Sequence, residues 1–274
     1  MKKKRRFKLG TTSFIVPDHI IPNVKFLGPY FDEIELLIFE SRPDVLPSPG
    51  EIEELNELSK IHDLDYNIHL PVDVSLSRGN SDQRKTGAGI LIDVIDRLNV
   101  LEPTTCTLHL EMPKEVCLAP AESKETQTWA ALVQIELSAF LARLETPGII
   151  SVETLDYPFS IIESIVKQEN ASICIDIGHG VKYGYDWLGI FGQNPGQVPI
   201  VHLHGVDFQF TPPKDHTRLD RLPDDAVKQV IDFLTLYTGT VSLEVFNPEN
   251  LKHSLAMLDR YFTDIPILSK PKRA

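Results

Sequence analysis

The stretch ICIDIGHG, residues 173–180, places an aspartate and a histidine three positions apart at the end of an alternating apolar run. A carboxylate and an imidazole directed at one small volume can move protons or hold a divalent cation. Taken alone, Asp176 could instead cap the turn that follows, and His179 could be an ordinary loop histidine. The choice between these interpretations depends on what the rest of the chain brings to the same place.

Residues of the same chemical kind close five further apolar stretches: His69 in YNIHLP, His109 in CTLHLE, Glu153 in IISVET, His202 and His204 in IVHLHG, and Glu244 in VSLEVF. Side chains alternate between the two faces of a strand, so Ser151 shares a face with Glu153, and Ser242 with Glu244. The polar faces are expected to point into the interior of a barrel, and the apolar faces toward its helices.

The elements that must position these residues alternate along the chain. Eight short β-rich stretches are each followed by a helical stretch, and they are FKLGTTSFIV, EIELLIFE, YNIHLP, CTLHLE, GIISVET, SICIDIGH, VPIVHLHG and TVSLEVF. Eight such units predict an α/β fold, a single (β/α)8 TIM barrel, with an open doubly wound sheet as the alternative. Enzymes with this barrel place their sites at the C-terminal ends of the strands, where all the residues above fall.

The 274 residues contain no proline- or glycine-rich linker, so we expect one barrel domain over residues 1–274, with short basic tails at both ends. The tails, MKKKRRFKLG at the start and KPKRA at the end, are expected to be solvated, with a phosphate-binding arm as the alternative. The start lacks the apolar segment of a signal peptide, and no stretch is long and apolar enough to span a membrane, which favours a cytoplasmic protein. The net charge of −12 disfavours a general nucleic-acid partner.

Three carboxylates, Glu153, Asp176 and Glu244, would meet at the barrel mouth. Clustered buried negative charge is unfavourable, and neutral histidines do not compensate it, whereas divalent cations do. Nitrogen and carboxylate ligands without thiolates suit zinc or manganese, with iron as a further candidate. The three cysteines have no zinc or redox spacing and, being odd in number, indicate no disulfide framework. The sequence therefore predicts a site for divalent metal.

The motifs at the strand ends resemble those of the xylose isomerase-like barrel superfamily, which includes the apurinic-site endonuclease family. CIDIGH is similar to the D-x-x-H motif of its sixth strand, SVET to the glutamate of the fifth, HLHG to the histidine of the seventh, and SLEVF to the glutamate of the eighth. The resemblance covers nearly the whole chain. It implies that Glu153, Asp176, His202 and Glu244 hold a divalent metal.

Two branches of this superfamily differ in their metal sites. Sugar isomerases and epimerases use one metal, with the two glutamates moving protons, whereas the phosphodiester-cleaving branch adds histidines on strands three and four, where this chain has His69 and His109. The resemblance then implies that Glu153 bridges two metals. Two metals about 3.5–4 Å apart can clamp the attacking and leaving oxygens of a phosphodiester.

The resemblance is incomplete at the third metal, which His179 and His216 would hold. The family reads D-x-H in the loop after strand seven, but this chain reads KDHTRL, so that Lys214 stands where the aspartate is expected and Asp215 is adjacent to His216. Asp215 remains a candidate ligand. His204 is expected to contact the substrate or support a ligand.

A finer resemblance is to cobamide-remodelling phosphodiesterases, carried by LGTTSFIVPDHIIPNV, DEIELLIFES, YNIHLPVDVSL, VHLHGVD followed by DHTRL, and SLEVFNPENL. It implies hydrolysis of the nucleotide-loop phosphoester of a vitamin B12-type cofactor to cobinamide and ribazole phosphate. Glu153 and Glu244 are then expected at the reaction centre, with Lys214 and Arg218 beside the phosphoryl oxygens.

Three alternatives remain open. They are a metal-dependent sugar or sugar-phosphate isomerase or epimerase, an apurinic-site endonuclease, and a non-catalytic binding barrel. A broad corrinoid substrate would suit aromatic residues expected near the mouth, although these rings could equally pack loops onto the barrel. The aromatic residues are Tyr183, Tyr185, Trp187, Phe208 and Phe210.

Overall fold

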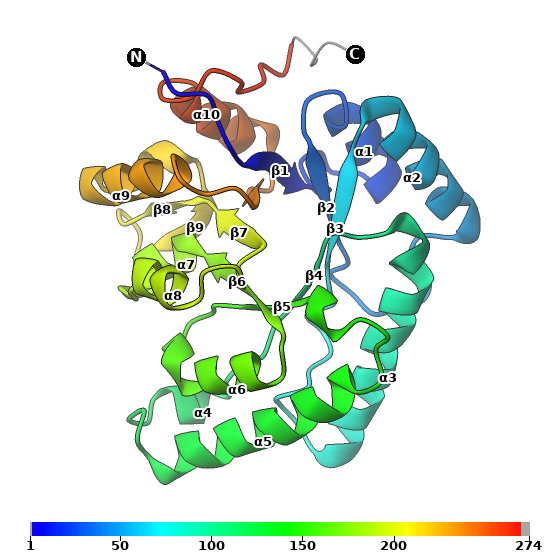
Figure 1. Cartoon of the computed structure of the whole chain (residues 1–274), viewed down its shortest axis with the longest axis vertical. Helices are drawn as coiled ribbons and strands as arrows, with labels where there is room; N and C mark the ends of the chain where they lie inside the picture. Colours follow the sequence, from blue (N-terminus) through cyan, green and yellow to red (C-terminus); the bar gives the residue numbers. More distant parts are fainter. Residues whose placement is uncertain (1, 270–274) are drawn as a thin grey trace.

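The computed structural model describes residues 2–269, which form a closed barrel of eight parallel strands (Figure 1). In spatial order the strands are β1 (Lys8–Thr12), β10 (Thr240–Leu243), β7 (Ile200–Leu203), β6 (Ser172–Asp176), β5 (Ile150–Glu153), β4 (Cys106–Leu108), β3 (Asp65–His69) and β2 (Glu33–Leu37). The first strand pairs with both β10 and β2, which closes the ring. The predicted (β/α)8 barrel is confirmed, and the open-sheet alternative is wrong. Each stretch predicted to be a strand overlaps one barrel strand.

Helices surround the barrel: α1 (Ile20–Leu27), α2 (Pro49–His62), α3 (Ser81–Leu98), α4 (Lys114–Cys117), α5 (Lys124–Leu141), α6 (Glu163–Gln168), α7 (Ile177–Tyr183), α8 (Trp187–Gln193), α9 (Asp224–Leu234) and α10 (Pro248–Leu258). Polar caps determine where the longer ones begin. Ser48 and Glu51 form a reciprocal capping box at the start of α2, and Asn80 and Gln83 form one at the start of α3.

Single-turn 3₁₀ helices complete the connections: η1 (Asn99–Leu101), η2 (Pro147–Ile149), η3 (Phe159–Ile161) and η4 (Leu219–Arg221). The elements that were not predicted include a helix and a two-stranded hairpin. Helix α7 follows β6 directly, where a turn was expected, and an antiparallel hairpin of β8 (Gly205–Asp207) and β9 (Lys214–Thr217) follows β7. Strand β9 could not be recognised in advance because its four residues, KDHT, are polar and lack an apolar alternation.

The barrel interior below the mouth is polar and hydrogen-bonded. Glu33 is fully buried and accepts hydrogen bonds from Asn67 Nδ2 and Thr104 Oγ1 at 2.8 Å and from Thr240 Oγ1 at 2.9 Å. Ile34, next along the strand, belongs to the apolar core. The predicted division into inward polar and outward apolar faces therefore holds on β2, and the barrel's polar interior leads up to the strand ends.

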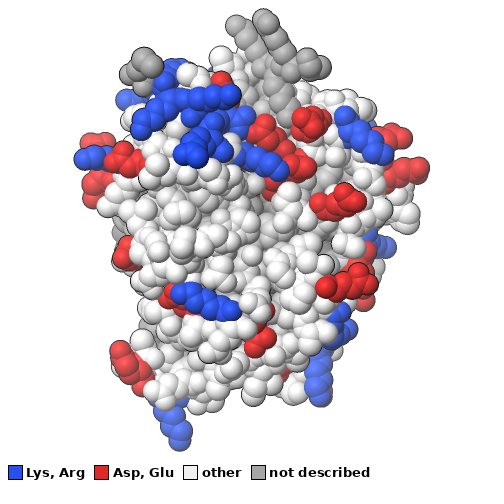
Figure 2. All heavy atoms as spheres, in the orientation of Figure 1, with Lys and Arg blue, Asp and Glu red and all other residues white. Residues whose placement is uncertain are grey.

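The basic run 2–6 differs from the expected solvated tail because it is attached to the C-terminal part of the barrel. The Lys3 N–H donates to the Tyr261 carbonyl at 2.8 Å, and Lys2 forms an ion pair with Asp259. Figure 2 shows blue atoms gathered near the end of the molecule where Figure 1 places the N-terminus. Because these residues precede β1, they lie toward the N-terminal ends of the strands, away from the barrel mouth. The predicted C-terminal tail, 270–274, lies outside the described residues.

Among residues 2–269, no helix combines the length and the apolar character that a membrane crossing requires.

Candidate metal centre

The barrel mouth brings together four groups of potential metal ligands, three of which share Glu153: His69, His109 and Glu153; Glu153, Asp176, His202 and Glu244; His179, His204 and His216; and Glu153, Cys174 and His202. Within each group the ligand atoms lie within 4.8 Å of one another. Of the predicted metal ligands, only Asp215 is outside these groups. Burial raises the pKa of the Cys174 thiol to about 12, which disfavours the thiolate that binds metals.

Glu153 ends β5 at the centre of the site. Its Oε2 atom lies 2.9 Å from His109 Nε2, 3.4 Å from His69 Nε2 and 3.5 Å from His202 Nδ1. The side chain is only 1% exposed. A single carboxylate is thus shared by the first two groups of ligands, which is the arrangement that a bridging ligand requires.

Asp176 caps the following helix and also lies in one of the candidate ligand groups. Its Oδ1 atom accepts the backbone N–H of His179 at 2.7 Å and so caps α7, while Oδ2 lies 3.4 Å from His179 Nδ1. The cap begins a helical turn that carries His179 back over the strand end. The helix cap made by Asp176 therefore places the His179 ring beside the Asp176 carboxylate.

Three histidines are oriented by backbone carbonyls. The Nδ1 atom of His69 lies 3.0 Å from the Leu70 oxygen, that of His179 3.3 Å from the Thr154 oxygen, and that of His216 3.1 Å from the Glu244 oxygen. A proton on Nδ1 that is donated to a carbonyl leaves the Nε2 lone pair free, as in metal-binding histidines.

His216 has a left-handed backbone, with φ of 49°, which is uncommon for a residue with a side chain. Such strained positions gather at functional sites. Burial lowers the pKa of His216, which favours the neutral ring that binds metals. Both observations are consistent with a ligand role for this residue, which the hairpin places at the mouth.

His204 closes the third group and contacts the second. Its Nε2 atom lies 3.2 Å from Asp176 Oδ2, and its Nδ1 accepts the backbone N–H of His216 at 3.1 Å. A Cβ on Gly178 would lie 2.1 Å from the His204 ring, so only glycine fits there. Gly178, between Asp176 and His179, is thus required by packing against His204.

The remaining predicted residues lie at the rim. Asp215 forms an ion pair with Lys182, and Lys214 is exposed at the start of β9. The Arg218 Nε lies 2.8 Å from Asp220 Oδ1. Asp215 therefore has a cationic partner of its own and does not complete the third group, in which His204 stands nearest to His179 and His216.

Unsatisfied buried atoms provide a test of whether this site suits a cation. Both ring nitrogens of His202 and the Oε2 atom of Glu244 are buried without a hydrogen-bond partner among residues 2–269, although His202 Nδ1 lies only 3.2 Å from that oxygen. Buried polar atoms are normally satisfied. A divalent cation would give His202 Nδ1 and Glu244 Oε2, which face each other, a common partner, so the residues fit a metal.

Charge coupling within the site shifts several pKa values. Burial alone would lower the pKa of His69, but the neighbouring carboxylates, Glu153 first among them, raise it to about 8. Burial would also lower the pKa of His204, but the neighbouring Asp176 carboxylate raises it to about 9. Burial would raise the pKa of Glu153, yet its histidine neighbours hold it well below its usual value. Without metal, the protein compensates its carboxylates with protonated histidines.

The stability of the metal-free protein is therefore expected to depend on pH. Because His69 and His204 bind protons more tightly in the folded state, their contribution is fully present below about pH 6.5 and is lost as the pH rises through about 8 and about 9. The melting temperature measured in chelator should fall between pH 7 and pH 9. With zinc the ligands must lose their protons, so the zinc-induced increase in melting temperature should grow over the same range. An unchanged metal-free melting temperature would contradict these couplings.

Glu35 is a site residue that the sequence analysis missed. It is fully buried on β2, its Oε1 atom lies 2.9 Å from His202 Nε2, and its Oε2 accepts the Ser242 hydroxyl. The other nitrogen of His202 faces Glu153 and Glu244. The alternation in EIELL, with glutamates on one face, was the available signal. Carboxylates behind a ligating histidine fix its orientation and raise its basicity.

Replacing Glu35 with glutamine is expected to weaken zinc binding by about 10-fold, and Glu35→Leu by about 100-fold, because loss of such support typically reduces affinity by these factors. Competition with a chelator measures the affinity. Glu33→Gln is the matched control, since Glu33 lies on the same face of β2 but accepts its hydrogen bonds from Asn67, Thr104 and Thr240, none of which is a ligand. Wild-type affinity in folded Glu35→Leu would exclude the role of Glu35.

The aromatic residues divide into two sets. Trp187 is 4% exposed and packs edge-on against Phe233, so its ring holds α8 on α9 and does not reach the mouth. Tyr183 is 40% exposed and lies 6.1 Å, centroid to centroid, from His179. The packing interpretation is therefore correct for Trp187, while Tyr183 stands beside the site.

A parallel barrel with histidines and carboxylates at its mouth defines the class of protein as a TIM barrel with a metal-type centre. Residues 23–261 match the family model described as xylose isomerase-like TIM barrel, so the chain belongs to this family. This confirms the family resemblance seen in the strand-end motifs. None of the curated proteins compared matches the chain in sequence.

Solved structures with the same fold have diverse names. The D-tagatose 3-epimerase-like protein is 19% identical with a TM-score of 0.73, over 93% of this chain and 97% of that one. Endonuclease IV from Thermus thermophilus is 18% identical with a TM-score of 0.66, over 92% and 99%. The IOLI protein, solved with a bound zinc atom, is 14% identical with a TM-score of 0.66, over 94% and 100%. At these identities the similarity shows the fold.

Proposed function

We propose that the protein is a metal-dependent phosphodiesterase of the cytoplasm that hydrolyses the nucleotide-loop phosphoester of a cobamide to cobinamide and ribazole phosphate. The observation that carries the proposal is the position of His69 and His109, whose Nε2 atoms both lie within 3.4 Å of Glu153 Oε2. These histidines add a second ligand group to the four residues that a single metal would need. The cobamide itself rests on the finer sequence resemblance.

The residues would hold two or three ions in the groups already described. One group is His69, His109 and Glu153; the second is Glu153, Asp176, His202 and Glu244; the third is His179 and His216 with His204 beside them. When bound, zinc, manganese or iron would supply Lewis-acid chemistry, which stabilises charge on phosphoryl oxygens and lowers the pKa of water.

The chain's own groups position the substrate and the ions. Glu153 fixes the spacing of the first two ligand groups, because its one buried oxygen faces both. Glu244 Oε2, buried without a hydrogen-bond partner among residues 2–269 and 3.2 Å from His202 Nδ1, would act as an ionised carboxylate at the reaction centre. Lys214 and Arg218, at the rim beside His216, would contact the phosphoryl oxygens of the substrate.

A metal-dependent sugar isomerase or epimerase is the second candidate. Glu153 and Glu244 flank the same His202 nitrogen at 3.5 and 3.2 Å, so both carboxylates could act on one small substrate as acid and base. This candidate gives His69 and His109 no metal to bind. An apurinic-site endonuclease is disfavoured by the net charge of −12.

Cleavage of a cobamide is the direct test. The purified protein is incubated with an adenosylated cobamide and, separately, zinc, manganese or iron, and cobinamide is sought by chromatography and mass spectrometry. We expect cobinamide to form with at least one metal and to be absent with a chelator. If no metal gives product while a ketose or sugar phosphate is isomerised, the epimerase function replaces the phosphodiesterase.

A further inference from the structure

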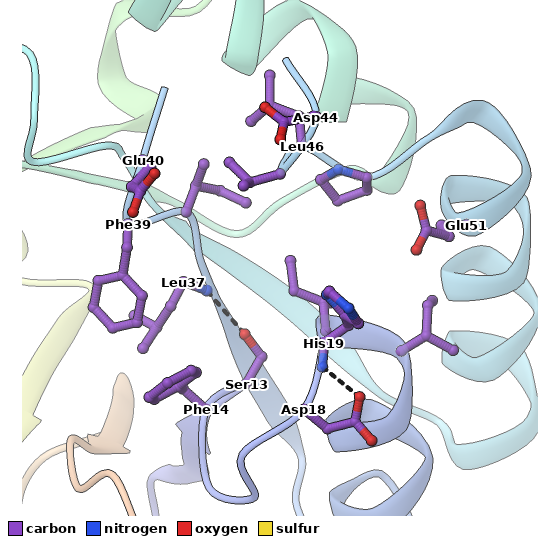
Figure 3. A pocket seen from close by; sticks show the side chains of 15 residues that line it. Ser13, Phe14, Asp18, His19, Leu37, Phe39, Glu40, Asp44, Leu46 and Glu51 are labelled. Atoms are coloured by element: carbon purple, nitrogen blue, oxygen red, sulfur yellow. Dashed lines mark hydrogen bonds between the residues drawn. The ribbon is translucent and has the colours of Figure 1, made fainter. Parts of the chain in front are cut away.

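A cavity of about 350 Å³ lies between the segments that follow β1 and β2 (Figure 3). The apolar part of its lining includes Phe14, Ile21, Leu37, Phe39 and Leu46. In Figure 3 the rings of Phe14 and Phe39 stand together on one side of the cavity, opposite the start of α2. Both strand ends belong to the barrel mouth, so the cavity is a neighbour of the metal centre.

A chain of aromatic rings connects the cavity to the third histidine group. The ring centroid of Phe246 is 4.9 Å from that of His216, 6.4 Å from that of Phe14 and 6.1 Å from that of Phe39. Although they pack against each other, Phe14 and Phe39 remain 42% and 41% exposed. One ring thus separates His216 from the wall of the cavity, so a substrate bound at the mouth can extend into it.

The charge around the cavity selects against anions. Asp18, Glu40, Asp44 and Glu51 are among its lining residues, and Arg42, which pairs with Glu40 at 2.9 Å, offsets part of this charge. A phosphate would be repelled here, whereas a neutral aromatic group would not. The phosphodiester therefore belongs at the metal centre, and an uncharged part of the substrate belongs in the cavity.

The volume of the cavity decides which half of a cobamide could enter it, the lower base or the corrin. Small-molecule pockets span about 300–1,000 Å³, so a cavity of about 350 Å³ accepts a two-ring base. The corrin macrocycle with its amide side chains is several times larger than such a base and cannot enter. The corrin half must then lie over the open mouth.

We propose that this cavity binds the aromatic lower base of the nucleotide, with Phe14 and Phe39 as its stacking wall. The assignment rests on the proposed phosphodiesterase function, because it takes the position of the phosphodiester from the metal centre. It identifies the β1 and β2 segments as the part of the protein that distinguishes one lower base from another.

Binding of benzimidazole riboside, which has the base and ribose but no phosphate, tests the cavity without any cleavage. Val45 lines the cavity and is 40% exposed, so Val45→Trp should fill the space without disturbing the fold. Val100→Trp is the matched control, because Val100 is 57% exposed in η1, which precedes β4 at the far end of the barrel. Calorimetric titration gives the dissociation constants.

We expect the riboside to bind wild type and Val100→Trp equally, and Val45→Trp at least 10-fold more weakly. Phe39→Ala should weaken binding about 5- to 100-fold, the usual effect of removing an aromatic partner from a base. No binding to wild type, or equal binding to both tryptophan variants, would overturn the inference. Riboside binding with this pattern but no cobamide cleavage would support the cavity and refute the proposed function.

Discussion

Replacing Glu153 with glutamine is expected to remove metal and activity together. The one oxygen that faces His69, His109 and His202 would become part of a neutral amide, so both ligand groups that share it would lose their common anion. Loss of a central electrostatic group typically reduces turnover by about 10³-fold, and we expect at least that loss of cobamide cleavage. Metal content after zinc loading, measured by elemental mass spectrometry, should fall by two ions per molecule.

The matched control for this variant is Glu111→Gln. Glu111 follows β4 on the same side of the barrel, but its carboxylate accepts hydrogen bonds from Ser75 and Arg78 and belongs to none of the ligand groups. Its replacement should leave metal content unchanged. An active Glu153→Gln protein with a full complement of metal would refute the bridging role of Glu153.

His109→Ala should separate the two candidate functions. It removes one ligand from the group that only the phosphodiesterase needs, while Glu153, Asp176, His202 and Glu244 stay in place. We expect zinc stoichiometry to fall by one ion and cobamide cleavage to fall about 10²- to 10³-fold, because charge at the phosphoryl oxygens loses one of its stabilising ions.

The control is His253→Ala on α10, a histidine outside every ligand group. It should retain both zinc and activity. If His109→Ala instead kept its full zinc content, then His109 would have no metal to hold, and the single-metal epimerase centre would be the better description.

The barrel and most of its candidate metal centre could be predicted because one pattern, the alternation of apolar and polar residues, carries both kinds of information. Alternation along short apolar stretches identified the strands, and it also placed Glu153 and Glu244 on inward faces at the strand ends. In a closed parallel barrel all such ends meet at one mouth. Residues that are far apart in the sequence were therefore predicted to be neighbours without knowledge of any contact between them.

The sequence did not predict which side chains contact one another where the contact depends on three-dimensional packing. Glu35 reaches His202 across the interior of the barrel, and the alternation of β2 does not reveal which side chain lies opposite. The hairpin determines that His204, rather than Asp215, joins His216, because Lys182 on α7 pairs with Asp215. Such choices depend on loop geometry and side-chain partners, which short-range patterns do not encode.

The most direct test of the phosphodiesterase function is hydrolysis of an adenosylated cobamide in ¹⁸O-labelled water by the zinc-loaded protein, followed by mass spectrometry of both products. If water attacks phosphorus, ribazole phosphate gains one ¹⁸O atom and cobinamide gains none. Label in the hydroxyl of cobinamide would contradict attack at phosphorus, and no cleavage by the fully metallated protein would contradict the proposed function.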